Sequence, residues 1–279
     1  MSLNQLNTGC SSELSARSGW RGTALVTGAS FGIGYELAKI LAQKGWALVL
    51  TARNGEKLLA MKRDFQKEHK VPVHIIAKDL ALPGACREIF DETARLGLYP
   101  EILINNAGFG GSGLFTETSF ENETDMIAVN IRSLTQLAKL FLPAMLKSRK
   151  GKIMNVASTA AFQPGPRMAV YYATKAYVLS FSEALAEELR GTGVTVTTLC
   201  PGPTRSEFQK RAGIENINML RWNVMMSSEE VARYGYEALM RGRRIAVPGL
   251  LNKFGTWGSR FVPRGFVTFV VSYLQNQAQ

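Results

Sequence analysis

The side chains best suited to proton transfer in this 279-residue chain are Tyr171 and Lys175. They lie four residues apart in a segment, Met168 to Arg190, whose spacing predicts a helix, so both project from one helical face. A free tyrosine has a pKa near ~10, and a neighbouring ammonium favours the phenolate and lowers that pKa. Lowering it by about 3 units requires roughly 4 kcal/mol of differential interaction. Tyr171 could then act as a general acid or base near neutral pH, although spacing alone leaves Tyr172 as an alternative.

Two other polar residues could assist this chemistry. Ser158 follows a predicted strand, Lys152 to Ala157, where a hydroxyl can meet a carbonyl oxygen. Asn130 lies in a predicted long helix, Asn122 to Lys147. Two histidines and three widely spaced cysteines are too few for a zinc site or a Ser-His-Asp triad, so we expect no metal.

A glycine-rich turn near the N-terminus predicts a phosphate site. The apolar run from Thr23 to Thr27 is typical of a buried strand, and helical spacing begins at Tyr35. Between them stand Gly28, Gly32 and Gly34, whose spacing differs from the common G-x-G-x-x-G. Free backbone N–H groups and the helix dipole favour an anion at such a turn, and glycines let a pyrophosphate approach closely.

The elements that must position these groups alternate along the chain. Predicted strands alternate with predicted helices, which implies a parallel sheet with helices on both faces. We therefore expect a Rossmann-like, doubly wound α/β fold. The remaining predicted strands are Trp46–Ala52, Val71–Ala77, Ile102–Ile104, Val194–Leu199 and Arg244–Pro248.

Arg53 stands directly after the second predicted strand, in the sequence Ala52-Arg53-Asn54. In a doubly wound sheet this position lies beside the adenosine ribose of a dinucleotide. A carboxylate there binds the 2′-hydroxyl of NAD, whereas a basic residue pairs with the 2′-phosphate of NADP. The sequence therefore favours NADP(H) over NAD(H).

Composition and charge argue against a membrane-spanning, secreted or nucleic-acid-binding protein. No apolar run approaches the ~20 residues of a membrane span, and residues 1–20 are polar and aperiodic without the pattern of a signal peptide. We interpret them as a disordered or loosely docked leader and expect a reduced, cytoplasmic protein. The net charge is +11, but the basic residues are scattered and no nucleic-acid-binding motif surrounds them, so we expect an anionic small molecule or lipid surface instead.

Several motifs occur in one order along the chain. They are Thr27 with the three glycines, Asp79-Leu80, Asn105-Asn106-Ala107-Gly108, Asn130, Ser158, Tyr171-x-x-x-Lys175 and Pro201-Gly202. In this order they resemble the short-chain dehydrogenase/reductase family, over roughly Gly22 to Pro248. Ser158 precedes Tyr171 by 13 residues, as is usual in that family, and this selects Tyr171 over Tyr172.

The resemblance implies a seven-stranded parallel sheet, a nicotinamide cofactor and a division of roles. Tyr171 would give a proton to the substrate carbonyl, Lys175 would bind the nicotinamide ribose and lower the tyrosine pKa, and Ser158 would polarise the carbonyl. Asn130 would hold a water that connects Lys175 to solvent. The implied cofactor-binding residues are Gly28, Ser30, Phe31, Gly32, Ile33, Gly34, Arg53, Asp79, Leu80, Asn106, Ala107, Gly108, Tyr171, Lys175, Pro201, Gly202 and Thr204.

The chain departs from the family pattern at two places. Thr204 comes earlier than the family's threonine and Ser206 stands near that position, so either could contact the carboxamide. Phe31 occupies the place of a basic residue in the glycine loop, so NADP preference rests on Arg53.

The substrate side is expected at the carboxyl edge of the sheet. Phe109–Phe115, Ala160–Met168 and Ser206–Val224 are candidates, and the segment of about 205–226 is apolar enough to form a lid or an ordinary packed helix. Residues of about 249–279 form an apolar and basic C-terminal extension. It could cover the pocket, pack against another subunit, or lie on an anionic membrane surface.

These observations predict one catalytic domain over residues 21–279, in a homodimer or homotetramer. We expect an NADPH-dependent carbonyl reductase, acting in either direction on an apolar or acyl-type ketone or aldehyde. A catalytically idle NADP-binding sensor or scaffold protein on the same fold is the alternative.

Overall fold

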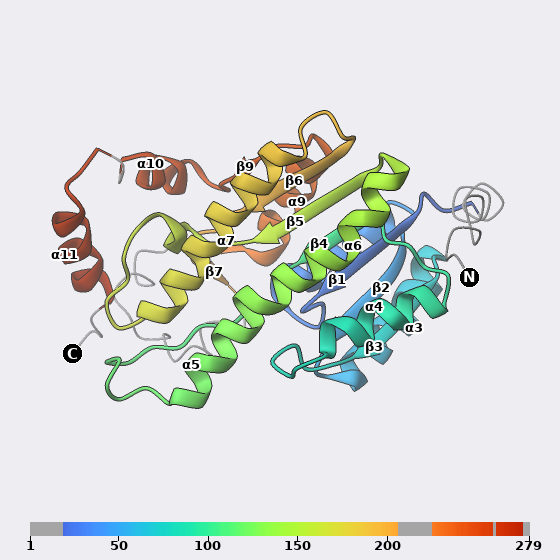
Figure 1. The fold of residues 1–279 in the computed structure, drawn as a ribbon, viewed down its shortest axis with the longest axis horizontal. Coiled ribbons are helices and arrows are strands. Elements are labelled where there is room, and N and C mark those ends of the chain that lie inside the picture. The colour runs from blue at the N-terminus through green and yellow to red at the C-terminus, as the bar shows by residue number, and fades with distance from the viewer. Residues whose placement is uncertain (1–18, 206–224, 259–260, 276–279) are drawn as a thin grey trace, which may run out of the picture.

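The predicted parallel sheet of seven strands is confirmed. A computed structural model describes residues 19–205, 225–258 and 261–275. The strands follow the order β3-β2-β1-β4-β5-β6-β9, and every neighbouring pair is parallel (Figure 1). Two further short strands, β7 and β8, pair with each other. The strands are β1 (Thr23–Thr27), β2 (Ala47–Ala52), β3 (Val73–Ala77), β4 (Ile102–Asn105), β5 (Gly151–Val156), β6 (Val194–Leu199), β7 (Thr204–Arg205), β8 (Met226–Ser227) and β9 (Ile245–Ala246).

Helices cover both faces of the sheet, because successive strand side chains point to opposite sides. Ala24 and Val26 of β1 pack in one apolar cluster, and Leu25 between them packs in the other. The first cluster takes in α2 (Gly32–Gln43), α3 (Gly55–His69) and α9 (Ser228–Met240). The second takes in α4 (Ala85–Arg95), α6 (Leu134–Ser148) and α7 (Ala169–Glu188), of which α6 and α7 cross in front of the sheet in Figure 1.

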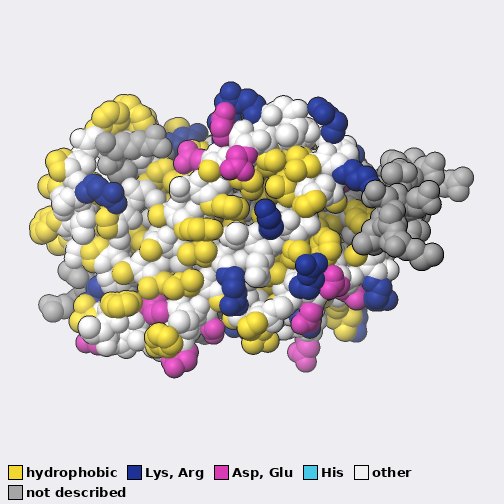
Figure 2. Space-filling model, in the orientation of Figure 1, with side chains coloured by type: hydrophobic (Ala, Val, Ile, Leu, Met, Phe, Trp, Pro, Cys, Tyr) yellow, Lys and Arg dark blue, Asp and Glu magenta, His cyan; other side chains and the backbone are white. Residues whose placement is uncertain are grey.

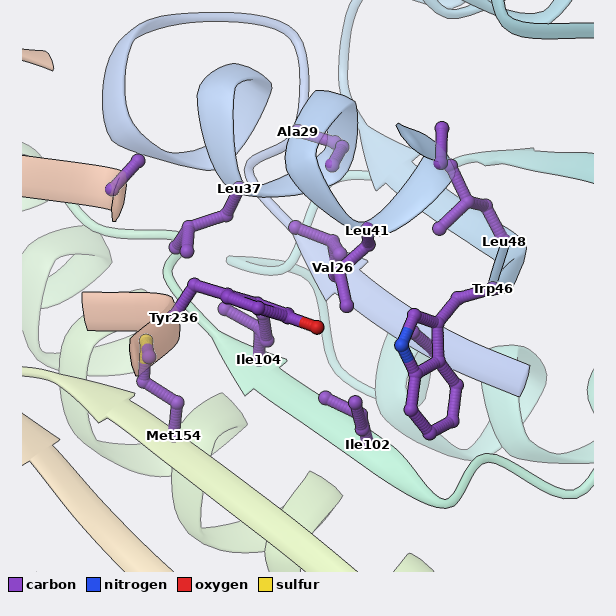
Figure 3. Close-up of a cluster of buried hydrophobic side chains, with 14 of the residues drawn as sticks. Val26, Ala29, Leu37, Leu41, Trp46, Leu48, Ile102, Ile104, Met154 and Tyr236 are labelled. Atoms are coloured by element: carbon purple, nitrogen blue, oxygen red, sulfur yellow. The ribbon is translucent and has the colours of Figure 1, made fainter. Parts of the chain in front are cut away.

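Figure 3 shows how the first cluster fixes α2 over the sheet. Leu37 and Leu41 lie one turn apart on α2, so both meet the sheet beside Val26. Tyr236 of α9 packs in the same cluster, next to Ile104 of β4. This packing sets where α2 begins, and therefore where its free N–H groups lie.

The strand order reverses between β1 and β4. From β1 the chain adds β2 and then β3 on one side, and from β4 it adds strands on the other side. In doubly wound sheets this reversal leaves a crevice at the carboxyl ends of the two central strands. Gly28 follows β1 and Asn106 follows β4, so both stand at this crevice.

The predicted continuous helix from Asn122 to Lys147 is interrupted. The segment consists of α5 (Phe120–Ile127), a π-helical turn (Ala128–Ser133) and α6. Wide π turns inside α-helices often mark functional sites, and this one contains Asn130. Spacing of apolar residues does not reveal such a turn, because α- and π-helical stretches of a few residues bury similar positions.

Several predicted segments fall wholly or partly outside the described residues. Only Gly19 and Trp20 of the leader are described, and of the candidate lid only Arg205, Met225 and Met226. The C-terminal extension forms α10 (Leu250–Gly258) and α11 (Arg264–Gln275). Within the described ranges, every helix is too short or too polar to cross a membrane.

Candidate active site

The glycine turn between β1 and α2 is shaped by contact with the loop that follows β4. Gly28 has a φ of +62°, which favours glycine, and a Cβ there would come within 2.8 Å of the Cα of Ala107. A Cβ on Gly34 would collide with the Asn106 amide and the Gly28 carbonyl oxygen. The two loops therefore touch only because these positions carry no side chain.

Hydrogen bonds tie the same two loops together. The hydroxyl oxygen of Thr27 accepts from the backbone N–H groups of Asn106 and Ala107, at 3.0 and 2.9 Å. The Asn106 side chain donates in return to the carbonyl oxygens of Thr27 and Gly28. Thr27 and Asn106 thus fix the crevice at the point where the strand order reverses.

A cleft of about 810 Å³ opens at this edge and joins the predicted cofactor residues to the predicted catalytic ones. The predicted site residues Gly32, Gly34 and Asn130 do not line it. The predicted residues that line it are Gly28, Ser30, Phe31, Ile33, Arg53, Asp79, Leu80, Asn106, Ala107, Gly108, Ser158, Tyr171, Lys175, Pro201, Gly202 and Thr204.

Asn130 is hydrogen-bonded to the loop after β4. Its side-chain oxygen accepts from the N–H of Phe109 at 3.1 Å, and its amide donates to the Phe109 carbonyl and to the Thr174 hydroxyl, both at 3.0 Å. Both amide hydrogens of this buried side chain are therefore engaged by protein groups. The contacts serve to position Phe109 and to link it to α7.

Ser158, Tyr171 and Lys175 meet at the centre of the cleft. The ammonium of Lys175 donates to the carbonyl oxygen of Val156 at 2.9 Å and lies 5.8 Å from the centre of the Tyr171 ring. Ser158 caps the short 3₁₀ turn Thr159–Phe162 by accepting from the N–H of Ala160, and it is hydrogen-bonded to Tyr171. The helical spacing of Tyr171 and Lys175 therefore brings both side chains to the same wall.

Burial is the main influence on the pKa values of Tyr171 and Lys175. Desolvation raises the pKa of Tyr171 well above its usual range, and the Ser158 hydrogen bond opposes this only in part. Desolvation also lowers the pKa of Lys175 to about 8. The sequence-based expectation of a lowered tyrosine pKa is therefore wrong for the protein without cofactor, because burial is the largest influence on this pKa. Tyr171 is held as the protonated phenol, which is the form that a proton donor needs.

Cations gather at the end of the cleft that Arg53 occupies. The exposed Arg53 side chain lies 3.8 Å from the carboxylate of Asp79. Lys57, on the first turn of α3, places its ammonium 3.3 Å from the centre of the Phe31 ring. Lys78 also lines the cleft and is paired with Glu88. Sequence reasoning missed Lys57 and Lys78, since neither belongs to a motif.

The predicted substrate loops form another part of the cleft, the substrate end, which also includes the polar side chain of Gln163. Phe109, Ala160 and Met168, from two of the three predicted substrate loops, line it together with Tyr172. The third segment, Ser206–Val224, is outside the described residues, as is Ser206 as an alternative to Thr204. Tyr172 is buried beside Tyr171, and its hydroxyl accepts from the amide of Gln275 on α11. No sequence signal linked two residues so far apart.

The residues present fit a nicotinamide dinucleotide. Gly108 stands where the cleft meets the catalytic group, and a Cβ there would lie 3.0 Å from the Asn130 oxygen and 3.3 Å from the Lys175 ammonium. Gly28 and Gly108 both line the cleft, so backbone rather than side chain faces a bound group at these two positions. Across the described residues, no cluster of three or more His, Cys, Asp or Glu could hold a metal.

Comparison with known proteins shows which family the chain resembles. Residues 22–216 match the model of the short chain dehydrogenase family. An uncharacterized oxidoreductase, YvaG of Bacillus subtilis, is 36% identical over 188 residues, which are 66% of this chain and 69% of the relative. A very-long-chain 3-oxoacyl-CoA reductase of Pyrenophora tritici-repentis is 38% identical over 185 residues, but the match spans 64% of this chain and only 54% of that protein.

Solved structures agree with the sequence matches. A short-chain dehydrogenase from Sphingobium yanoikuyae in complex with NADPH superimposes with a TM-score of 0.77 at 31% identity, covering 93% of this chain and 99% of that one. The family model, the sequence relatives and the solved structures indicate the same family. The chain therefore belongs to the short-chain dehydrogenase/reductase family of nicotinamide-dependent oxidoreductases that act on CH–OH groups.

Proposed function

We propose that this protein is an NADPH-dependent carbonyl reductase, which reduces an apolar or acyl-type ketone or aldehyde to an alcohol or catalyses the reverse reaction. The observation that carries the proposal is the meeting of Ser158, Tyr171 and Lys175 on one wall of the cleft that the glycine turn also lines. A bound NADPH would supply the hydride.

Each residue of this group has a role that follows from its contacts. Tyr171, held protonated by burial, donates its phenol proton to the substrate oxygen. Ser158 is hydrogen-bonded to Tyr171 and holds the same oxygen in place. Lys175 lies close enough to Gly108 to bind the cofactor ribose. Asn130 positions the loop through Phe109, and the water that the resemblance implies at Asn130 stays part of the proposal.

The preference for NADP rests on Arg53. Its guanidinium lines the cleft and is more than half exposed, so it can turn toward a 2′-phosphate. No carboxylate directly follows β2, where NAD-binding sheets carry one. The Sphingobium yanoikuyae relative, which is described in complex with NADPH, supports the same choice.

Apolar side chains at the substrate end of the cleft support an apolar or acyl-type substrate. Phe109, Ala160, Met168 and Tyr172 offer ring and aliphatic surface next to Tyr171. The Pyrenophora relative is named for a very-long-chain 3-oxoacyl-CoA substrate, although this chain spans about half of its length.

Two further properties belong to the proposal. We place the protein in the cytoplasm because the buried thiols of Cys86 and Cys200 are both free, as in a reducing compartment. We also propose a homodimer or homotetramer, since exposed Phe115, Phe120 and Tyr177 lie on or beside α5 and α7.

A substrate screen tests the proposed reaction. Purified protein is mixed with NADPH and a panel of ketones, aldehydes and 3-oxoacyl thioesters, and loss of NADPH absorbance is followed. Turnover with at least one carbonyl, and a lower efficiency with NADH, is the expected result. Binding of NADPH without turnover on any carbonyl would instead favour an NADP-binding sensor or scaffold protein.

A further inference from the structure

The C-terminal helices α10 and α11 carry many large apolar side chains that are exposed among the described residues. On α11, Phe266, Phe269, Val270 and Tyr273 follow the spacing of one helical face. No residue of α10 is buried. The large apolar side chains of α10 and its following turn are between 62% and 71% exposed, and they are Leu250, Leu251, Phe254, Trp257 and Phe261.

The opposite face of α11 is anchored, so the exposed face has a fixed orientation. Val267 and Val271 pack with Tyr171 and Tyr172, and Gln275 is hydrogen-bonded to Tyr172. These three residues are spaced by four, which puts them on the side of α11 away from Phe269. α11 therefore packs with one face against two tyrosines that line the cleft, and it presents the other face to the surroundings.

The charge of the extension indicates which kind of surface it can bind. The sequence contains no Asp or Glu after Glu237, while Lys253, Arg260 and Arg264 all lie within residues 249–279. Two copies of this surface placed face to face would bring like charges together. Exposed rings beside basic side chains match the interface of an anionic bilayer, where rings enter the headgroup region and basic groups meet phosphates.

Figure 2 shows hydrophobic side chains gathered at the end of the molecule that α10 and α11 form. Neither helix is long enough to cross a bilayer, since α10 has 9 residues and α11 has 12. A short helix with an apolar face and basic neighbours lies in the plane of the interface instead.

We propose that the exposed faces of α10 and α11 bind the surface of an anionic phospholipid membrane. The aromatic and aliphatic side chains enter the headgroup region, and Lys253 and Arg264 meet the lipid phosphates. This binding would bring the substrate end of the cleft to the membrane, and it does not depend on which reaction the site performs.

Vesicle co-sedimentation of the full chain tests the proposal. Vesicles of phosphatidylcholine mixed with phosphatidylglycerol are compared with vesicles of phosphatidylcholine alone. We expect binding to the anionic vesicles, weakened by salt, and little binding to the neutral ones. Absence of binding to anionic vesicles overturns the proposal.

Surface variants identify the binding face. Phe254→Ser with Phe269→Ser removes two exposed rings, and we expect at least about a tenfold loss of vesicle affinity. Lys253→Glu with Arg264→Glu should weaken binding by about fivefold or more per residue. The control is Tyr99→Ser, because Tyr99 is also an exposed ring but precedes β4, at the amino end of that strand and away from the cleft at its carboxyl end. Equal affinity of the serine variant and the control contradicts the assignment.

The fluorescence of Trp257 provides an independent measure of membrane binding. Sedimentation velocity tests the competing possibility, which is self-association of the chain through the same surface. On addition of anionic vesicles, tryptophan emission should shift to the blue in the wild-type protein, and the shift should be smaller in Trp257→Phe. If the Phe254→Ser, Phe269→Ser protein instead loses self-association in solution and keeps its vesicle affinity, the surface is an interface between copies of this chain and the proposal is wrong.

Discussion

The ammonium of Lys175 lies 5.8 Å from the centre of the Tyr171 ring, and both side chains are almost fully buried. Burial shifts the pKa values of these two groups in opposite directions. It raises the pKa of the phenol and lowers the pKa of the amine to about 8, because each charged form loses its hydration. The site without cofactor thus keeps the phenol proton in place and makes the amine easy to deprotonate.

The lowered pKa of Lys175 predicts a measurable pH dependence of stability. Folded Lys175 loses its proton near pH 8, whereas an unfolded lysine keeps its proton to about pH 10.4. Between these values the unfolded chain binds more protons, so this group makes the free energy of unfolding rise with pH, by at most about 1.4 kcal/mol per pH unit. Below pH 8 both states are charged and the contribution is constant.

Denaturant unfolding of the cofactor-free protein and of Lys175→Met checks this slope. The wild-type minus variant difference in unfolding free energy should increase with pH from about 8 to about 10. Cys200 and Tyr171 have raised pKa values and act in the opposite direction, but both proteins contain them. Parallel profiles for the two proteins would show that the amine keeps its usual pKa.

Arg53→Asp should move cofactor preference toward NADH. The change removes the cation beside Asp79 and places a carboxylate where a 2′-hydroxyl can donate to it. We expect kcat/KM with NADPH to fall by about tenfold to a hundredfold relative to NADH. Arg63→Asp is the control, since Arg63 is exposed on the following helix, α3, but does not line the cleft. An unchanged ratio of the two efficiencies would exclude Arg53 from the phosphate contact.

Asn130→Ala should destabilise the fold as well as impair turnover. The substitution leaves the backbone N–H and C=O of Phe109 without their partner, which lowers the free energy of unfolding by about 1–3 kcal/mol. Asn130→Asp keeps the acceptor and loses the donor, so we expect an intermediate loss. Denaturant unfolding measures both, and a wild-type stability for Asn130→Ala would show that Phe109 is held by other contacts.

Gly34→Ala should disrupt the junction of the two loops. The added methyl collides with Asn106 and with the Gly28 backbone, and overpacking of this kind lowers stability by about 1–3 kcal/mol. NADPH affinity should fall with it. Gly255→Ala is the matched control, because Gly255 is also helical but has nothing within 4 Å of its Cβ position. That control should keep or raise the stability, by up to about 1 kcal/mol.

The sequence predicted the sheet because its signals were local. Val26, Leu48 and Ile104 lie in short apolar runs bounded by glycines and polar residues, and each run formed a strand within two residues of its predicted ends. The catalytic and cofactor residues lay in motifs with fixed spacing, and they make up half of the residues that line the cleft.

Contacts between distant segments were not predictable. The hydrogen bond of Gln275 to Tyr172 joins two helices that share no motif, and the contact of Lys57 with the Phe31 ring joins the first turn of α3 to the glycine turn. The pKa of Tyr171 was also missed, because the sequence shows the neighbouring amine but not the depth of burial, which dominates. Asn130 was found, yet its contacts with Phe109 depend on a π-helical turn that spacing does not reveal.

The central claim is that Tyr171 donates the proton, and a comparison of Tyr171→Phe with Tyr172→Phe tests it most directly. Both tyrosines are buried neighbours that line the cleft, so the two variants remove the same hydroxyl from adjacent positions. NADPH affinity is measured first, and kcat with a carbonyl substrate second. We predict that Tyr171→Phe binds NADPH normally and loses about a hundredfold or more of kcat, while Tyr172→Phe keeps most of it. Turnover retained by Tyr171→Phe, or lost only in Tyr172→Phe, would contradict the account.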